Sequence, residues 1–306
     1  MKHRPKHIVE YILLRGLLGV VNILPLRAGL ALGWLIGAFF FHVLRYRRDK
    51  ALSRLKEVFG DRFTEKERQR IAWLSFRNIC FNAIEVARFH KLTAEKIQQM
   101  PLYKQMEHVQ KLHKETGSLV LATIHMGNWD LAGVACKLDD MPIFSIARRQ
   151  KNPLTDALLN KMRNATGMEV VLNDSRVLQN VVRTLKKGSV LAILPDVRSR
   201  TEALSIDFLG GQANLGAGTA IFAQMAKCPV VPVVVLRKGW TRHEAKVFDP
   251  ILPNPEIDKK EDRERIMRQL ISIFDAEIQA NPEQYFWFNK RWVLDPIRRK
   301  AADGSE

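Results

Sequence analysis

The chain has 306 residues, 46% of them hydrophobic, and a formal net charge of +17. This length suits one large α/β domain with an accessory segment, and the linker or internal repeat that two equal domains would need is missing. The excess of positive charge indicates nucleic acid or an anionic membrane surface as a partner.

The first 54 residues combine basic side chains with apolar sequence. They hold ten Lys and Arg residues against two acidic ones, and residues 28–44 form a run of seventeen without Asp, Glu, Lys or Arg. Such a run is at the short limit for a membrane-spanning helix, and a shallow membrane helix or a buried core helix fits its length as well. The run lies far from Met1 and no small-residue cleavage site follows, which is unlike a cleavable signal peptide. We predict that residues 1–54 anchor the chain in a membrane, with the rest on the cytoplasmic side because basic residues follow the run.

The rest of the chain, residues 55–306, is predicted to form one α/β domain. Apolar residues at helical spacing over residues 61–90 and 94–114 predict an N-terminal helical layer. Short apolar runs then alternate with helical stretches, which predicts a mixed, largely parallel sheet flanked by helices. The strands are expected at residues 118–124, 143–147, 168–172, 189–195 and 229–236, and the helices at 129–138, 153–165, 175–187, 217–226 and 259–280.

The most informative motif follows the first predicted strand and reads His125-Met126-Gly127-Asn128-Trp129-Asp130. It lies at the carboxyl end of a strand, where ligands bind in open α/β sheets. The Gly127-Asn128 dipeptide predicts a tight turn that folds Asp130 back toward His125. A carboxylate beside an imidazole fixes its tautomer and raises its basicity, so the pair is suited to removing a proton from an alcohol. The plain alternative is a histidine that only caps the turn.

Polar residues after the other strands are expected to face the same crevice. Arg148 and Arg149 follow the strand at 143–147, and Asp196 and Arg198 follow the strand at 189–195. Arginine suits the recognition of phosphate or carboxylate, and a cation also stabilises an oxyanion. The alternatives are a solvated basic pair for the first two residues and a turn cap for Asp196. The glycine-rich run at 209–218 precedes a predicted helix, a position where backbone amides can meet an anion.

Other classes of protein find less support in the sequence. A metal-dependent hydrolase using His125, Asp130, Asp196 and His243 lacks ligands at standard metal spacing. A nucleic-acid-binding protein is suggested by charge alone, because no zinc-finger, basic-zipper or RNP-like pattern appears. A dinucleotide-binding oxidoreductase would need a third glycine after Gly216-Ala217-Gly218. The three cysteines are scattered and odd in number, which is typical of core residues in a reducing compartment.

Taken together, these motifs resemble a known family. His125 to Asp130 resembles the His-x-x-x-x-Asp/Glu block of the glycerolipid acyltransferase superfamily. Further stretches resemble the late acyltransferases of lipid A biosynthesis, the lauroyl and myristoyl transferases. The stretches occur in the same order, and the resemblance extends from the N-terminal anchor to about Pro296. These stretches are Arg148 with Asn152-Pro153, Leu194-Pro195-Asp196, and residues 206–210, 226–232 and 282–287.

The resemblance implies a glycerol-3-phosphate acyltransferase-like fold and a bacterial inner-membrane enzyme whose catalytic domain faces the cytoplasm. Such an enzyme moves a fatty acyl group from acyl carrier protein, or from coenzyme A, to a hydroxyl of a glycolipid such as a lipid A precursor. Another glycolipid or a lysophospholipid is the alternative acceptor. The expected partners are the carrier protein, the glycolipid and an anionic membrane surface, without nucleic acid. Neither a cofactor nor a metal is expected, since a thioester is already activated.

The resemblance also implies roles for individual residues. His125 is expected to be the general base and Asp130 its partner. Arg148 is expected in the active cleft and Asp196 beside the acceptor, and the other expected substrate contacts are Arg149, Arg198 and Asn128. The predicted reaction is direct attack of the hydroxyl on the thioester, because no Gly-x-Ser-x-Gly elbow for an acyl-enzyme is present.

Overall fold

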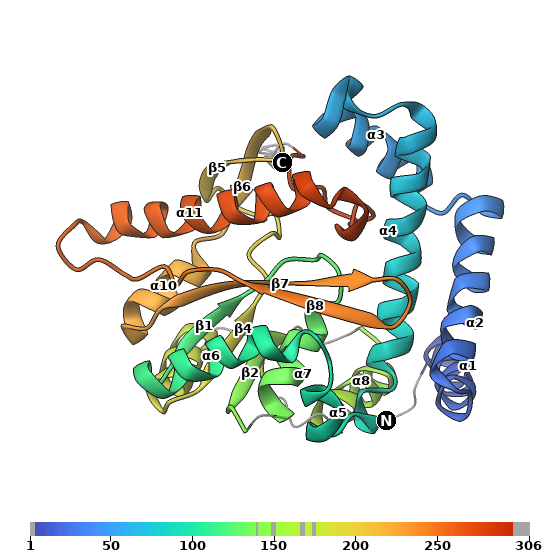
Figure 1. Cartoon of the computed structure of the whole chain (residues 1–306), viewed down its shortest axis with the longest axis horizontal. Coiled ribbons are helices and arrows are strands. Elements are labelled where there is room, and N and C mark those ends of the chain that lie inside the picture. Colours follow the sequence, from blue (N-terminus) through green and yellow to red (C-terminus); the bar gives the residue numbers. More distant parts are fainter. Residues whose placement is uncertain (1–3, 139, 148–150, 166–168, 173–175, 296–306) are drawn as a thin grey trace, which may run out of the picture.

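The computed structural model describes residues 4–138, 140–147, 151–165, 169–172 and 176–295. A six-stranded sheet of order β3-β2-β4-β1-β7-β8 lies at its centre (Figure 1). Neighbouring strands are parallel except β8, which pairs antiparallel with β7. The predicted mixed, largely parallel sheet is therefore confirmed. The strands are β1 (Leu119–Ala122), β2 (Ile143–Ala147), β3 (Glu169–Leu172), β4 (Val190–Ile193), β7 (Val230–Lys238) and β8 (Arg242–Val247).

Helices cover both faces of this sheet, which explains why most of its strands, unlike the edge strand β8, are largely apolar. In β1, Leu119 and Leu121 pack into one buried cluster, while Val120 and Ala122 pack into another. The first cluster contains α5 (Ala94–Gln98), α6 (Tyr103–Thr116) and α7 (Trp129–Leu138). The second contains α9 (Val177–Lys186), α10 (Gly218–Ala226) and α11 (Lys259–Ala280). α8 (Pro153–Ala165) lies between β2 and β3 in the chain and packs against α1 (Pro5–Ile23).

The glycine-rich run at 209–218 adopts a structure that the sequence did not predict. β5 (Leu204–Phe208) and β6 (Gly211–Leu215) form a separate antiparallel hairpin that packs on α11. Its two-residue turn, Leu209-Gly210, has φ angles of +53° and +75°. Positive φ at both turn positions is the geometry that matches the twist of a hairpin, and glycine adopts it without strain. Most of the expected anion-binding run is thus a hairpin turn and its second strand.

The predicted N-terminal helical layer is present, with different boundaries. α4 (Glu65–Val86) has Thr64 as its N-cap, and the side chains of Thr64 and Glu67 form a reciprocal capping box. The helix expected at 94–114 is divided into α5 and α6, and Pro101 lies in the break, where its ring would obstruct a continuous helix. The expected boundary after residue 54 falls inside α3 (Arg48–Phe59).

The N-terminal segment folds as α1, α2 (Leu26–Ala38) and a π-helical turn, Phe39–Val43, along one side of the molecule (Figure 1). α2 packs closely on α4 through Gly29, Gly33 and Gly37. A Cβ atom at Gly33 would lie 3.0 Å from Ile84 Cγ1, and one at Gly37 would lie 3.0 Å from Cys80 Sγ. Glycine at these positions lets the two helices approach each other.

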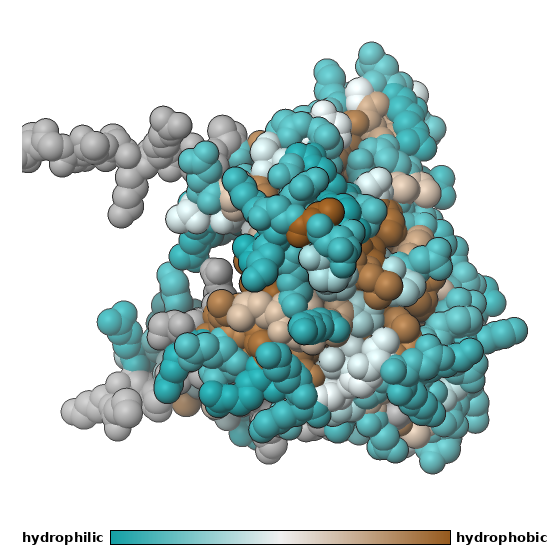
Figure 2. Space-filling model, turned by 90° about the vertical axis from the view of Figure 1, so that its left-hand side faces the viewer, coloured by the Kyte–Doolittle hydropathy of each residue, from teal (hydrophilic) through white to brown (hydrophobic). Residues whose placement is uncertain are grey.

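The same segment exposes most of the large apolar side chains. Of the twenty exposed large hydrophobic residues in the described ranges, fifteen lie between Ile8 and Tyr46. The window Leu26–Val43 is long and apolar enough to cross a membrane, and only 28% of it is buried. A helix inside a soluble core would be mostly buried, so the core-helix alternative does not fit. The opposite end of the molecule, with α10 and the loop before α11, is mostly hydrophilic with smaller apolar patches (Figure 2).

Candidate active site

His125 and Asp196 meet at the carboxyl edge of the sheet. β1 and β4 are parallel neighbours in which Ala122 pairs with Ile193, and each of the two residues lies three positions beyond that pair. His125 Nδ1 lies 2.9 Å from Asp196 Oδ1, and the backbone amide of His125 donates to Asp196 Oδ2 at 3.0 Å. One carboxylate therefore holds both the ring and the main chain of the histidine.

The surroundings make His125 a stronger base than an ordinary histidine. The Asp196 side chain is completely buried, whereas 24% of the His125 side chain is exposed. Burial lowers the pKa of His125, but the charge and hydrogen bond of Asp196, with a contribution from Asp130, outweigh it and raise that pKa. Because Nδ1 faces a carboxylate, Nε2 is the nitrogen left to accept a proton from another molecule.

Asp130 lies in the first turn of α7, where the sequence places it close to His125. Its side chain is half-buried, and its charge helps to raise the pKa of His125. The carboxylate that accepts the hydrogen bond of the imidazole is that of Asp196, which was expected to lie beside the acyl acceptor. The strand order brings these three residues together, as expected for strand ends that meet at one edge.

A segment far along the chain completes the turn after β1. The amide of Gly127 donates to the carbonyl of Gln284 at 2.8 Å, and the amide of Phe286 donates to the carbonyl of His125 at 2.8 Å. The rings of Trp129 and Phe286 lie 5.2 and 6.5 Å from the imidazole, measured between centroids. These contacts fix the backbone on both sides of the histidine and give it aromatic neighbours.

Gly127 occupies a position that only glycine can fill. Its φ is +55°, and a Cβ atom there would lie 1.8 Å from the backbone oxygen of Val235. The adjacent amide of Asn128 donates to that same oxygen at 2.9 Å. The turn therefore lies directly against β7, and this contact fixes the position of His125 relative to the sheet.

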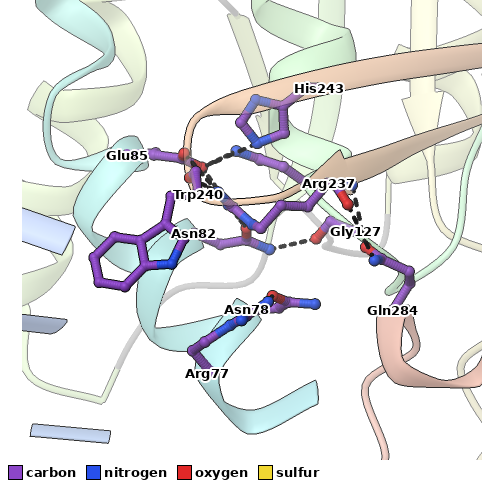
Figure 3. A network of polar contacts seen from close by, with 10 residues as sticks. Arg77, Asn78, Asn82, Glu85, Gly127, Arg237, Trp240, His243 and Gln284 are labelled. Carbon is purple, nitrogen blue, oxygen red and sulfur yellow. Dashed lines mark hydrogen bonds and ion pairs between the residues drawn. The ribbon is translucent and has the colours of Figure 1, made fainter. Parts of the chain in front are cut away.

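A buried polar network supports the turn from the side of α4. Figure 3 shows Arg237 of β7 reaching toward Asn82 and Glu85 of α4, with His243 of β8 beside Glu85. Arg237 donates to Glu85 Oε1 at 2.8 Å and to Asn82 Oδ1 at 2.7 Å, and His243 Nε2 lies 3.4 Å from Glu85 Oε2. Burial raises the pKa of Glu85, but the hydrogen bonds and charge of Arg237, with the imidazole of His243 nearby, outweigh it and lower that pKa to about 2.

This buried network around Glu85 and Arg237 was not predicted from the sequence. A usable signal was present, because Ser75, Asn78, Asn82 and Glu85 recur at helical spacing in a helix whose remaining inward positions are apolar. All four side chains are buried and polar. Polar residues on the buried face of a helix need partners. Here the partners are Gly127, Asn128, Arg237, Glu283 and Tyr285.

The other predicted site residues have different surroundings. Asn128 is fully buried and its side-chain amide donates to Glu85 Oε2 at 2.7 Å, so contact with a substrate would require that amide to leave the network. Arg198 is half-buried and donates through Nε to the carbonyl of Asp295 at 2.8 Å. Arg148 and Arg149 lie outside the described residues. Within the described part of the chain, no group of three His, Cys, Asp or Glu residues is placed to hold a metal ion.

Comparison with known proteins identifies the family. A family model described as bacterial lipid A biosynthesis acyltransferase matches residues 2–293. The chain is 21% identical over 273 residues to the lipid A biosynthesis acyltransferase of Haemophilus influenzae, covering 89% of this chain and 81% of the relative. It is 24% identical over 189 residues to the phosphatidylinositol mannoside acyltransferase of Mycolicibacterium smegmatis, covering 60% of this chain and 59% of the relative. The chain belongs to the bacterial lipid A biosynthesis acyltransferase family and is an acyltransferase.

Proposed function

We propose that this acyltransferase moves a fatty acyl group from the thioester of acyl carrier protein to a hydroxyl of a glycolipid, with His125 as the general base. The observation that carries the proposal is the partly exposed imidazole of His125 paired with the buried carboxylate of Asp196. A neutral histidine with a raised pKa suits proton removal from an alcohol near neutral pH. The names of both relatives, which refer to lipid A and to a phosphatidylinositol mannoside, support a glycolipid acceptor.

The proposed mechanism is a single displacement through a tetrahedral intermediate. Nε2 of His125 takes the proton of the acceptor hydroxyl while the hydroxyl oxygen attacks the thioester carbonyl carbon. Asp196 stabilises the imidazolium that forms, and Asp130 adds a second negative charge nearby. The intermediate then collapses to the ester, the carbon–sulfur bond breaks, and the thiolate leaves with the proton from His125.

The distribution of charge and apolar surface supports a membrane-bound enzyme with an acidic donor protein. We propose that α1, α2 and the π-helical turn embed their exposed apolar faces in a membrane while α1 packs on α8 and α2 on α4. The net charge of +17 favours the anionic cytoplasmic leaflet of a bacterial inner membrane, and it also favours the acidic carrier protein over an uncharged donor.

Mass spectrometry of a defined reaction tests this function. The full-length protein in vesicles of anionic phospholipid is given acyl carrier protein loaded with a fatty acid, together with a lipid A precursor. We expect the precursor to gain the mass of one acyl group, and we expect His125→Ala to reduce the rate by about 100- to 10,000-fold while the protein stays folded. A well-folded His125→Ala protein with near wild-type turnover would contradict the general-base role.

Parallel reactions separate the donors and the acceptors. Acyl-coenzyme A replaces the carrier protein in one reaction, and a phosphatidylinositol mannoside or a lysophospholipid replaces the lipid A precursor in others. Faster transfer from the carrier protein, with an advantage that shrinks as salt rises, is the expected result because the docking is electrostatic. Transfer from coenzyme A alone, insensitive to salt, would assign the donor differently.

A further inference from the structure

The polar face of α4 reaches the His125 turn through two direct contacts. The Asn82 side-chain amide donates to the carbonyl of Gly127, and Glu85 Oε2 accepts from the Asn128 side-chain amide at 2.7 Å. Gly127 and Asn128 are the second and third residues after His125 in the chain. A shift at either residue is therefore transmitted to the histidine through a few backbone bonds.

Arg237 holds the two α4 side chains in place. Its guanidinium bonds to both carboxylate oxygens of Glu85, to Asn82 Oδ1 and to the carbonyl of Trp240 (Figure 3). The orientation of Asn82 follows from this contact, because its oxygen accepts from Arg237 and its nitrogen must then face Gly127. The guanidinium is planar and its donors are fixed, so it sets the positions of Asn82 and Glu85 relative to each other.

Burial makes this arrangement selective for one geometry. Arg237 is 3% exposed, Asn82 4% and Glu85 7%, and Asn128 is fully buried. A buried polar group left without a partner costs about 1–3 kcal/mol, and more when it is charged, so the contacts persist together or are lost together. All four side chains are buried, and the hydrogen bonds described for them lead to the turn, to one another and to the carbonyl of Trp240.

We propose that Asn82, Glu85, Asn128 and Arg237 are positioning residues, which hold the turn after β1 so that the imidazole of His125 stays aligned with Asp196. This inference rests on the proposed role of His125 as the base and assigns a function to the buried network. It also gives Asn128 a role different from the substrate contact expected from the sequence. Among the described residues, the charged groups that act on His125 are Asp196 and Asp130, and the buried hydroxyl of Tyr285 lies next to Asp196.

The test compares two variants of one helix face. Asn82→Leu removes the contact with Gly127, whereas Asn78→Leu, one turn earlier on α4, removes a contact with the carbonyl of Glu283. Both asparagines are buried, so both variants lose buried hydrogen bonds. Only the first variant removes a bond made directly to the turn, since Asn78 contacts the segment at Glu283 instead. The readouts are kcat and KM in vesicles, the melting temperature, and the pKa of the His125 imidazole by NMR titration without substrate, with its signal assigned by its loss in His125→Ala.

We expect Asn82→Leu to reduce kcat by about 10- to 100-fold with little change in KM, because misplacing a reacting group by about 1 Å costs rate rather than binding. We also expect the pKa of His125 to fall toward its ordinary value, since the hydrogen bond that raises it is weakened. Asn78→Leu should lower that pKa less, because its contact reaches the turn only through the segment at Glu283. A folded Asn82→Leu protein with the kcat and the His125 pKa of the Asn78→Leu control would overturn the proposal.

Asn128→Ala provides the second arm, including the case in which Asn82→Leu does not fold. It deletes one amide and leaves the Glu85–Arg237 pair intact. A positioning role predicts a lower kcat and a lower His125 pKa, whereas a rise in KM with an unchanged His125 pKa would assign Asn128 to the substrate and overturn its positioning role. The NMR titration needs no acyl transfer, so the positioning inference is decided even where His125→Ala keeps its activity and the general-base proposal fails.

Discussion

Asp196 contacts His125 through both carboxylate oxygens, one on the ring nitrogen Nδ1 and one on the backbone amide. The two residues are 71 positions apart, and they meet because β1 and β4 are neighbours in the sheet. The double contact fixes the rotation of the ring as well as its tautomer. Nε2 then points away from the carboxylate, where a hydroxyl can approach it.

The pH dependence of the reaction tests this pair. A general base must be neutral, and the pKa of His125 is raised, so the acidic limb of kcat/KM in the wild type is expected above pH 6.5. Asp196→Asn removes the charge that raises the pKa, so the limb should move to lower pH while the maximal rate falls by about 100-fold or more. Rate measurements between pH 5 and 9 give both quantities.

Asp130→Asn is the matched control for the same measurement. It removes a carboxylate that acts on His125 by charge, and the structure shows the imidazole hydrogen bond on Asp196. We expect a shift of the acidic limb in the same direction but smaller, with a smaller loss of rate. A larger effect at Asp130 than at Asp196 would restore Asp130 as the main partner of the imidazole.

Gly127→Ala is expected to destabilise the fold and abolish activity. The new Cβ atom would lie 1.8 Å from the oxygen of Val235, so the turn must move away from β7. Strain at positive φ together with overpacking amounts to about 3 kcal/mol or more. Gly117→Ala is the control, because Gly117 also has a positive φ, +74°, in the left-handed region, with nothing within 4 Å of an added Cβ atom. Chemical denaturation should show a loss of about 1–2 kcal/mol for the control; equal losses would mean that crowding against β7 is unimportant.

The packing of α2 on α4 allows a similar comparison. Gly33→Leu places a side chain where even a Cβ atom would lie 3.0 Å from Ile84, whereas Gly16→Leu in α1 meets open space. We expect Gly33→Leu to separate the two helices and to lower the melting temperature of the vesicle-bound protein. The Gly16 variant should melt like the wild type, and a melting temperature unchanged in both would show that close approach of α2 contributes little.

The exposed apolar face of α1 predicts membrane binding that can be weakened without unfolding the protein. Leu13 is 68% exposed in α1, and Leu252, in the loop before α11, is 59% exposed. Leu13→Glu should reduce sedimentation with anionic vesicles, because a charge in the apolar face opposes insertion, while Leu252→Glu should bind like the wild type. Equal binding by both variants, with unchanged circular dichroism, would place the membrane contact elsewhere.

The sequence predicted the sheet well because most of its strands are buried on both faces and are therefore continuous apolar runs. β2 and the helices α7, α8 and α11 begin and end at the predicted residues. β8 and the β5–β6 hairpin were missed, because each mixes polar with apolar residues and lies at an edge or outside the main sheet. Leu204, Ile206 and Phe208 of β5 alternate with polar residues as in a half-buried strand, and this signal was not used.

The candidate site was predicted only in part, for a reason of topology. His125, Asp130 and Asp196 were identified because each follows an apolar run or lies in a recognisable motif. Which carboxylate bonds to the imidazole depends on which strands are neighbours, and strand order is not written in local sequence. The polar face of α4 could have been recognised from its spacing, but its partners Arg237 and His243 come from β7 and β8, and local sequence does not show that they meet Glu85.

The bonds that join residues 284 and 286 to the turn after β1 have a consequence for synthesis of the chain. A ribosome that has produced β1 and its histidine must add more than 150 further residues before those partners exist. Until then the turn lacks two of its backbone hydrogen bonds and the nascent enzyme has an incomplete site. The N-terminal helices are therefore synthesised well before the polypeptide is able to acylate a substrate.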